Sequence, residues 1–375
     1  MKISTLLIIL TLFSYIAIPT MTVSAEHQKL QEQLELEEGR LINTTLNSML
    51  KGDKMELFIT YLKLYKKNYE ATSPEGQKRF TIFCSRLEEI NSHNDDKTKT
   101  WTLGLDQFSD MTLEEFKRNY TMKNTKFKDE LFYTAGLNII EYKPDTSNMN
   151  YRPIDWSKYS GKSIVQGDCG SCFAISTVNA LETNYALATG KQFEYYSKQQ
   201  ILDCNIYSHG CDGGDKKVVI GYQNIYGLVP EASYPYTQKV GPCQYDVLKG
   251  SAKKLSNGFE SVNDIESTAF CGKAGLFDTL TRGVVVSSID AAPLQGFKTG
   301  ILDLKGRCTE SNHAILITGY GIEAGVEYWI VKNTWGPTSG VDGYVRVKVY
   351  DDKNDFQNNC YLQCKYVRPF FEIIS

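Results

Sequence analysis

The chain has 375 residues and a formal net charge of −3 at pH 7. That length accommodates about two domains with a sizeable core. Because binding to nucleic acid phosphates requires a clear excess of basic residues, the near balance of charge argues against nucleic acid as the main partner.

The first 25 residues have the pattern of a secretory signal peptide. Lys2 precedes an apolar stretch from Leu6 to Ile18, and small residues follow, which is the order typical of cleaved signals. A membrane anchor is the alternative, but the apolar stretch is short for a span and Pro19 interrupts it. We therefore predict that residues 1–25 are removed in the secretory pathway and that the mature protein has no membrane span.

Two helical stretches are expected next. Residues from Glu26 to Leu64 read as a charged helix that carries leucines. A second helix is predicted from Pro74, which suits a first helical turn, to about His93. Its apolar residues recur at helical spacing and form one stripe: Phe80, Phe83, Leu87 and Ile90.

A short capped helix and a linker are predicted before residue 150. The sequence from Ser109 to Thr112 reads as a helix cap, and Leu113 to Phe116 would form the first turn. From Lys123 to Asn150 polar residues dominate without periodicity, which is typical of a linker where proteases cut.

The composition changes after Asn150, where tyrosine, glycine and cysteine become frequent. Of the ten cysteines only Cys84 precedes this point, and in a secreted protein most of the others should form disulfides. Cys172 to Thr189 reads as one helix that ends at Gly190. Four strands are predicted farther on: Val284–Ile289, Ala314–Gly319, Tyr328–Lys332 and Tyr344–Val349. A helical half followed by a stranded half indicates an α+β protein with two lobes.

The densest motif is the run QGDCGSCF from Gln166 to Phe173, which leads into this helix. Cys172 would lie at the helix N-terminus, where the macrodipole and the free N–H groups lower the pKa of a thiol and favour a nucleophile. The Cys169-x-x-Cys172 spacing also fits a redox pair or half of a zinc site, for which Cys360 and Cys364 could supply the other ligands.

Two further motifs supply partners for such a thiol. His313 opens an apolar strand, which directs its ring out of the end of the sheet. A lone histidine is more often structural, but a thiolate–imidazolium pair requires a partner of this kind. Asn333 ends another apolar strand and precedes Trp335, so its amide could hydrogen-bond an imidazole that the indole shields from water. Alone, this last motif is only a strand that ends in a turn.

Together these motifs resemble the papain family of cysteine proteases, of the cathepsin L type, from about residue 151 to the C-terminus. The resemblance implies that Cys172 is the nucleophile, His313 the acid–base, Asn333 the residue that orients the imidazole and Trp335 its shield. It also implies that the Gln166 side chain and the backbone N–H of Cys172 form the oxyanion hole.

The resemblance also implies a substrate cleft. Gly213 and Gly214 match the glycine wall whose backbone pairs with an extended peptide, and Trp335 borders the same cleft. The main specificity pocket is expected to be more polar than in relatives because of four residues: Asp215, Lys216, Ser288 and, at its base, Lys365. Phe173 replaces the usual tryptophan; because it is still aromatic, we expect the packing to survive with adjustment.

The first half supports the resemblance independently. Six residues fall on the spacing of the ERFNIN motif of cathepsin L-type propeptides, with Arg86 in place of the usual asparagine: Glu75, Arg79, Phe83, Arg86, Ile90 and Asn94. Four fall on the second propeptide motif, with Asp106 in place of asparagine: Gly104, Asp106, Phe108 and Asp110. Residues Glu26 to Asp53 precede the usual propeptide start and form a helical extension of unknown role.

The implied organisation is a signal peptide at 1–25, a helical inhibitory propeptide at 26–148 and a papain-like peptidase domain at 149–375. The domain would have the two-lobe fold, with a helical left lobe and a β-barrel-like right lobe. Its implied disulfides are Cys169–Cys211, Cys204–Cys243 and Cys308 with either Cys360 or Cys364, of which Cys360 is favoured. Cys271 and Cys364 would then form a fourth bridge, and Cys84 would be a free thiol.

The sequence therefore predicts the precursor of a cysteine endopeptidase that acts through a thioester acyl-enzyme and needs neither a metal nor an organic cofactor. Expected partners are protein and peptide substrates, its own propeptide and cystatin-type inhibitors. We expect a monomer that is lysosomal, vacuolar or secreted, with glycans on the sequons at Asn43 and Asn119. The main alternative is an inactive homologue that binds peptides without cleaving them; a secreted disulfide oxidoreductase is a more distant one.

Overall fold

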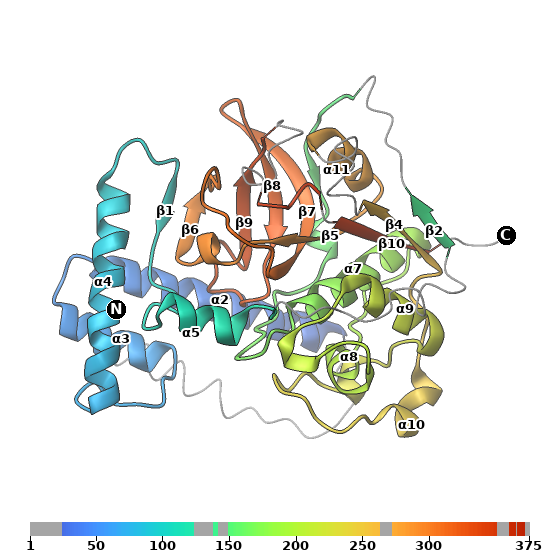
Figure 1. Cartoon of the computed structure of the whole chain (residues 1–375), viewed down its shortest axis with the longest axis horizontal. Helices are drawn as coiled ribbons and strands as arrows, with labels where there is room; N and C mark the ends of the chain where they lie inside the picture. The colour runs from blue at the N-terminus through green and yellow to red at the C-terminus, as the bar shows by residue number, and fades with distance from the viewer. Residues whose placement is uncertain are drawn as a thin grey trace.

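The computed structural model describes residues 25–123, 138–141, 149–262, 272–350, 360–364 and 366–371. Helices from the first part of the chain lie against a body that consists of a helical lobe and a stranded lobe (Figure 1). The predicted α+β organisation behind an N-terminal helical part is confirmed. None of the helices in the described ranges combines the length and the apolar character that crossing a bilayer needs.

The single helix predicted from Glu26 to Leu64 is in fact two, α2 (Ala25–Met49) and α3 (Lys54–Leu64). The break occurs because Gly52 closes a turn onto the carbonyl of Met49. The Asp53 carboxylate then accepts the N–H of Glu56 and caps a new helix. Helix α4 (Pro74–Asp95) agrees with the prediction, and the helices share one apolar core that includes Ile42, Leu46, Leu57, Phe58, Phe83, Leu87 and Ile90.

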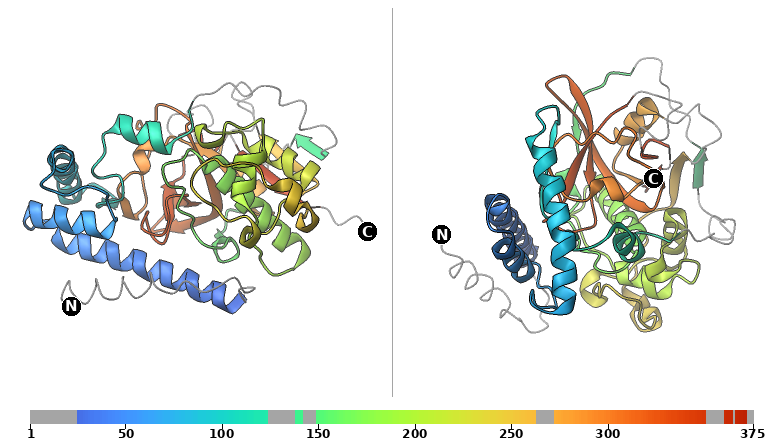
Figure 2. Two further views of the ribbon diagram at one scale, coloured as in Figure 1. Left: turned by 90° about the horizontal axis from the view of Figure 1, so that it is seen from below. Right: turned by 60° about the vertical axis from the view of Figure 1, so that its left-hand side comes forward.

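Helix α5 (Leu113–Tyr120) begins where predicted, because Thr112 and Glu115 form a reciprocal capping box. Just before it, strand β1 (Trp101–Leu103) pairs antiparallel with β6 (Phe297–Gly300) of the stranded lobe. This pairing fixes the N-terminal helices to the rest of the molecule. Two further views show α2 running beneath both lobes and α4 standing beside the stranded one (Figure 2).

The helical lobe is built around α7 (Cys172–Thr189), whose bounds match the prediction. Gly190 ends the helix with a φ of 64°, a left-handed conformation that glycine adopts without strain. The other helices of this lobe are α8 (Lys198–Cys204), α9 (Lys216–Tyr226) and α10 (Tyr245–Leu248). Because α7 also packs against the sheet of the other lobe, its first residue lies where the lobes meet.

The stranded lobe contains a sheet in the order β2-β4-β10-β5-β7-β8-β9, with β3 paired to β7. The bounds are β3 (Ile154–Asp155), β4 (Gly258–Val262), β5 (Val285–Ile289), β7 (His313–Glu323), β8 (Val326–Lys332), β9 (Tyr344–Lys348) and β10 (Tyr366–Phe370), with α11 (Lys273–Leu280) beside them. The lobe was expected to be barrel-like. Within the described ranges the sheet does not close, because β2 and β9 at its two edges do not pair with each other.

Strand β2 (Asn138–Glu141) lies inside the segment predicted to be a linker and pairs in parallel with β4. The free edge of β4 offers hydrogen-bonding groups, which explains how a segment without periodicity can become a strand. The predicted signal peptide and the remaining linker residues, including most of the stretch from Lys143 to Tyr151 where we expect cleavage, lie outside the described residues, apart from short pieces at their ends.

Candidate active site

Cys172 is the first residue of α7 and directly follows the N-cap residue Ser171. Its side chain is buried. The sulfur accepts a hydrogen bond from the backbone N–H of Ala314, at 3.3 Å. Ala314 is the second residue of β7, so the strand that begins with His313 reaches across from the stranded lobe to the thiol of the helical lobe.

His313 and Asn333 are brought together by the antiparallel pairing of β7 and β8. The Nε2 atom of His313 lies 2.8 Å from Oδ1 of Asn333. Oδ1 also accepts the N–H of Thr334 at 2.8 Å, which is consistent with its being the oxygen of the amide. Because that oxygen can only accept, Nε2 carries the proton of the neutral imidazole and Nδ1 is the basic nitrogen. Nδ1 is buried and has no hydrogen-bond partner among the described residues.

The indole of Trp335 covers this pair on one side. It stacks on the imidazole of His313 with ring centroids 4.9 Å apart and an interplanar angle of 29°. Two aromatic rings from the N-terminal part meet the indole edge-on, Phe108 at 5.0 Å and Phe116 at 5.5 Å. The N-terminal part of the chain therefore seals the site from water.

Burial determines the protonation of both reactive groups. Loss of solvent raises the pKa of Cys172 to about 12, although backbone N–H groups, first that of Ala314, oppose the shift. Loss of solvent lowers the pKa of His313 to about 4, against the effect of the hydrogen bond with Asn333. The expected lowering of the thiol pKa by the helix N-terminus is therefore not realised while the N-terminal part covers the site. Thiol and imidazole are both neutral near pH 7 in this state.

Gln166 lies on the loop before α7, and both ends of its amide are engaged. Nε2 donates to the carbonyl oxygens of Cys169 at 2.8 Å and Tyr120 at 3.0 Å. Oε1 accepts a hydrogen bond from the hydroxyl of Thr334. The carbonyl of Tyr120 belongs to the N-terminal part of the chain. Gln166 can therefore donate to a carbonyl placed at this site.

The chain after α5 lies between the two lobes and begins with Thr121, whose backbone is extended, with φ −117° and ψ 162°. The N–H of Met122 donates to the carbonyl of Asn312 at 2.8 Å, and the N–H of Lys123 donates to the carbonyl of Asp212 at 2.9 Å. These bonds use backbone groups from both lobes. The segment thus occupies the cleft in the way that an extended peptide would.

The two glycines predicted to form the substrate wall border this segment. Gly213 has a φ of 121°, and a Cβ at this position would lie 3.0 Å from the Cβ of Met122. A Cβ on Gly214 would overlap the ring of Phe173 at 2.2 Å. Phe173 is buried, so its ring packs against the wall as expected for an aromatic residue at this position.

The residues predicted to make the specificity pocket polar have different surroundings. Asp215 is the N-cap of α9, and its Oδ1 accepts the N–H of Lys217 at 2.7 Å. The amino group of Lys216 donates to the hydroxyl of Ser288, a buried residue of β5, at 2.8 Å. Lys216 and Ser288 are therefore brought together, whereas the Asp215 carboxylate caps a helix. Lys365 lies outside the described residues.

Three disulfides join the pairs that the sequence predicts: Cys169–Cys211, Cys204–Cys243 and Cys308–Cys360. Because Cys169 is bonded to Cys211, it does not form a redox pair or a zinc site with Cys172. Cys84 on α4 carries a free thiol, as predicted. The predicted bridge from Cys364 involves Cys271, which lies outside the described residues.

Sequence reasoning did not identify Tyr236. Its hydroxyl donates to the backbone carbonyl of Gln166 at 2.7 Å and also hydrogen-bonds the hydroxyl of Ser171. One side chain thus joins the loop that carries Gln166 to the residue before Cys172. The only available signal was the sequence Tyr-Pro-Tyr that ends at this residue.

Lys332, directly before Asn333, was also missed. Its amino group donates to Oδ1 of Asn179 at 2.8 Å and to the carbonyls of Gly161, at 2.9 Å, and Ser160. Burial lowers the pKa of Lys332 to about 7. These bonds anchor the end of β8. A lysine within an otherwise apolar strand was the signal, since a buried charge requires partners.

His313 and Asn333 form a buried pair, and the strand that begins with His313 contacts the thiol of Cys172 at the start of α7. The chain's own N-terminal part covers this site. This arrangement defines the latent form of a thiol peptidase. A family model for papain family cysteine proteases matches residues 152–370, and one for the cathepsin propeptide inhibitor domain (I29) matches residues 58–116. The chain belongs to the papain family of cysteine proteases and is a precursor with an inhibitory propeptide domain.

Relatives and solved structures agree with this membership. The chain is 33% identical over 307 residues to a cathepsin L-like proteinase of Fasciola hepatica, which covers 79% of this chain and 89% of the relative. It is 34% identical over 304 residues to pro-cathepsin H of Bos taurus, covering 78% and 84%. The structure of digestive procathepsin L 3 of the Tenebrio molitor larval midgut superimposes with a TM-score of 0.72 and 27% identity, covering 86% of this chain and 100% of that chain.

Proposed function

We propose that the chain, once its propeptide is removed, hydrolyses peptide bonds with Cys172 as nucleophile, His313 as acid–base and Asn333 as the residue that orients the imidazole. The hydrogen bond between His313 and Asn333 is the observation that carries this proposal. This bond engages Nε2 of His313 and leaves the basic Nδ1 without a partner among the described residues. The next residue, Ala314, donates its N–H to the thiol of Cys172.

The reaction would proceed in two stages. The thiol proton of Cys172 moves to Nδ1 of His313, and the thiolate attacks the peptide carbonyl. Gln166 and the N–H of Cys172 donate to the oxyanion, at about 3 kcal/mol per donor. The C–N bond then breaks as the imidazolium protonates the leaving amine. Water finally attacks the thioester, gives up its proton to the imidazole, and releases the acid and the free thiol.

The propeptide inhibits by occupying the cleft. Tyr120 places its carbonyl on Gln166, and Met122 and Lys123 form backbone hydrogen bonds with both walls. We propose residues 26–148 as the removed segment and 149–375 as the mature enzyme, after loss of a signal peptide at 1–25. The cut would fall between Lys143 and Tyr151.

The substrate preference would follow from the polar wall that Lys216 and Ser288 form, 2.8 Å apart. We propose an endopeptidase that accepts a polar side chain in this pocket more readily than relatives with an apolar one. A monomeric lysosomal, vacuolar or secreted enzyme, open to cystatin-type inhibitors, is the setting that fits a precursor of this kind.

A peptidyl epoxide tests the catalytic assignment, because such a compound alkylates an activated thiol at a peptide-binding cleft. We expect the acid-treated protein to carry a single adduct, on Cys172, and to lose peptidase activity in proportion. Denatured protein is the control and should not react at this residue selectively. A homologue that only binds peptides would leave Cys172 unmodified. That result, or peptidase activity that persists when Cys172 is fully modified, would contradict the proposal.

Tyr236 is proposed as a positioning residue, because its hydroxyl holds both Gln166 and the start of α7. Tyr236→Phe should lower kcat about tenfold with little change in KM, since the oxyanion contact matters most in the transition state. Tyr234→Phe is the matched control. Its hydroxyl donates to Asp203 at 2.7 Å and to the carbonyl of Pro242 at 3.1 Å.

The control should lose about 1 kcal/mol of stability for its hydrogen bonds and keep its kcat. Steady-state kinetics and thermal unfolding of both variants measure the two effects. Equal losses of kcat in the two variants would mean that Tyr236 has only a structural role.

A further inference from the structure

Helix α2 (Ala25–Met49) precedes the matched propeptide inhibitor domain, which begins at residue 58. The inhibitory contacts in the cleft come from residues 120–123, far along the chain. Figure 2 nevertheless shows α2 lying along both lobes of the peptidase domain. Its position requires an explanation that the cleft-filling segment does not supply.

The N-terminal half of α2 contacts the helical side of the peptidase domain. Tyr195 donates its hydroxyl proton to Oε1 of Glu32 at 2.8 Å. The amino group of Lys162 lies 3.2 Å from both carboxylate oxygens of Glu35. Lys162 belongs to the segment that leads to α7, so these two contacts hold the helix to the lobe that carries Cys172.

The C-terminal half of α2 contacts the stranded lobe. The guanidinium of Arg40 forms a two-point contact with the Asp342 carboxylate, at 2.9 and 2.7 Å. The amino group of Lys298 donates to Oδ1 of Asn43 at 2.7 Å. Gly39 approaches the backbone of Pro337 so closely that a Cβ would lie only 3.2 Å away. Glycine therefore favours this close approach, although it disfavours a helix interior.

These contacts come from one face of the helix. Glu32, Glu35, Gly39 and Asn43 recur at intervals of three and four residues, which places them in a single row. Ile42 and Leu46 continue this side of the helix toward its C-terminal end, where they are buried in the core of the propeptide helices. Helix α2 therefore joins the propeptide to both lobes of the enzyme.

The contacted loop also supports the catalytic site. Residues 336–343 follow Trp335, and Asn333 forms two bonds with them: its N–H donates to the carbonyl of Gly343 at 2.9 Å, and Nδ2 donates to Ser339 at 3.4 Å. Lys298 additionally donates to the carbonyl of Thr338, at 3.2 Å. The loop that α2 contacts is therefore also hydrogen-bonded to Asn333.

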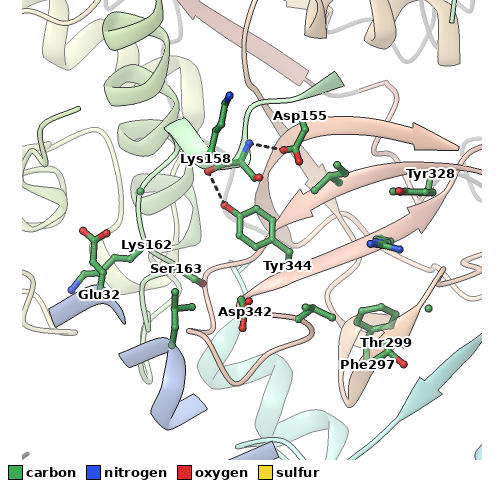
Figure 3. Close-up of a pocket in the computed structure, with 17 residues that line it drawn as sticks. Glu32, Asp155, Lys158, Lys162, Ser163, Phe297, Thr299, Tyr328, Asp342 and Tyr344 are labelled. Carbon is green, nitrogen blue, oxygen red and sulfur yellow. Dashed lines mark hydrogen bonds between the residues drawn. The ribbon is translucent and has the colours of Figure 1, made fainter. Parts of the chain in front are cut away.

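The interface is polar and incompletely filled. A cavity of about 670 Å³ lies between α2 and the two lobes, lined by Glu32, Leu36, Lys162, Asp342 and Tyr344 among others (Figure 3). The Arg40 side chain remains 62% exposed. A helix held by separate polar anchors across a hollow should detach more easily than one packed on a continuous apolar surface, and salt should weaken its ion pairs.

We propose that the face formed by Lys162, Tyr195, Lys298 and the 336–343 loop is a docking surface for α2, which acts as a strap that keeps the precursor closed. The strap is a second attachment of the propeptide, separate from the segment in the cleft. This inference rests on the proposed function, because it concerns the latency of the same site.

A triple variant tests the strap in the full-length precursor: Glu35→Gln, Gly39→Gln and Arg40→Gln. It removes the charges of Glu35 and Arg40 and the close approach of Gly39 to Pro337. Glutamine at position 39 favours the helix more than glycine does. The matched control is Lys51→Gln, which breaks the exposed ion pair with Asp95, at 3.0 Å, inside the propeptide. All proteins are produced without N-glycosylation, because a glycan on Asn43 would stand on the docking face.

The readout is alkylation of Cys172 by iodoacetamide near neutral pH, followed by peptide mass spectrometry. Cys172 is buried under the propeptide, so its labelling reports opening and needs no catalysis. We expect the triple variant to label about tenfold faster than the native precursor and the control to label at the native rate. Added salt should accelerate labelling of the native precursor more than that of the triple variant.

Unchanged labelling in the triple variant would overturn the strap, whether or not the mature protein is a peptidase. Failure of the mature protein to cleave peptides would instead count against the proposed function. A charge exchange distinguishes loss of the Arg40–Asp342 contact from misfolding. Arg40→Asp should accelerate labelling, and the double variant with Asp342→Arg should restore the native rate. Lack of restoration in a folded double variant would contradict the docking geometry.

Discussion

The variant Cys172→Ser is expected to fold like the native chain and to lose at least about 10⁴-fold in kcat. A hydroxyl is far less acidic than a thiol, so the imidazole of His313 cannot generate a useful nucleophile from it. The small change in side-chain size at a buried position leaves the packing of α7 intact. Steady-state hydrolysis of a peptide substrate after acid treatment measures the loss, and far-ultraviolet circular dichroism checks the fold.

Cys84→Ser is the matched control for this variant. Cys84 also carries a free thiol, and it lies on α4 in the propeptide. Its replacement should leave the activity of the mature enzyme unchanged, because the propeptide has been removed by then. Retention of more than a few per cent of native turnover by Cys172→Ser would refute the assignment of the nucleophile.

Acid should convert the precursor to the active enzyme, and the pKa of His313 predicts the pH range. In the covered site this pKa is lowered to about 4 by burial, whereas an exposed imidazole titrates near 6.5. At pH values between these two pKa values, His313 carries a proton in the uncovered state but not in the covered state. Falling pH therefore favours uncovering from about 6.5 down to about 4, and has no further effect through this group outside that window.

A carboxylate of the propeptide acts in the same direction at lower pH. Burial alone would raise the pKa of Glu115, but hydrogen bonds from the Thr112 N–H and from Arg79 outweigh it and hold the pKa below its ordinary value. The contact between Glu115 and Arg79, at 2.6 Å, therefore stabilises the folded propeptide at pH values above the ordinary pKa of a glutamate. This contribution is lost as the pH falls through the lowered pKa.

The conversion rate of the precursor across pH, followed by gel electrophoresis and peptidase assay, tests this prediction. We expect the rate to rise steadily as the pH falls below about 6.5. Glu115→Gln should convert faster than the native precursor near neutral pH and show a weaker dependence at the acid end. Full activity of the uncut precursor at any pH, or a rate that increases with pH, would contradict the mechanism of latency.

Local sequence predicted the helices around the site and the residues that we propose as reactive groups. The bounds of α7 followed from an apolar run that starts at Cys172 and stops at Gly190. The strand that begins at His313 and the strand that ends just before Asn333 were recognisable from their apolar residues, because neighbouring positions in a chain are enough to define such elements. Three disulfides followed from the family resemblance and agree with the structure.

The split of the first predicted helix shows where local reasoning was insufficient. Leucines and charges continue through residues 26–64, so the pattern suggested one helix. Only the turn at Gly52 and the cap at Asp53 redirect the chain, which lets α2 lie along both lobes while α3 packs in the propeptide core. The partners of α2 lie 127 to 302 residues away, from Lys162 for Glu35 to Asp342 for Arg40, and leave no periodic trace in the sequence.

Local motifs thus predict which residues carry the proposed chemistry, since the proposed nucleophile, imidazole and amide each stand in a recognisable motif. The solvent exposure and the protonation of these groups depend on the tertiary structure. The propeptide excludes water from Cys172 and His313 and reverses the expectation that a helix N-terminus lowers the thiol pKa. Likewise, Tyr236 acquires its position only when distant loops meet. Solvent exclusion and long-range hydrogen bonds depend on segments far apart in the chain, and a local pattern contains no information about them.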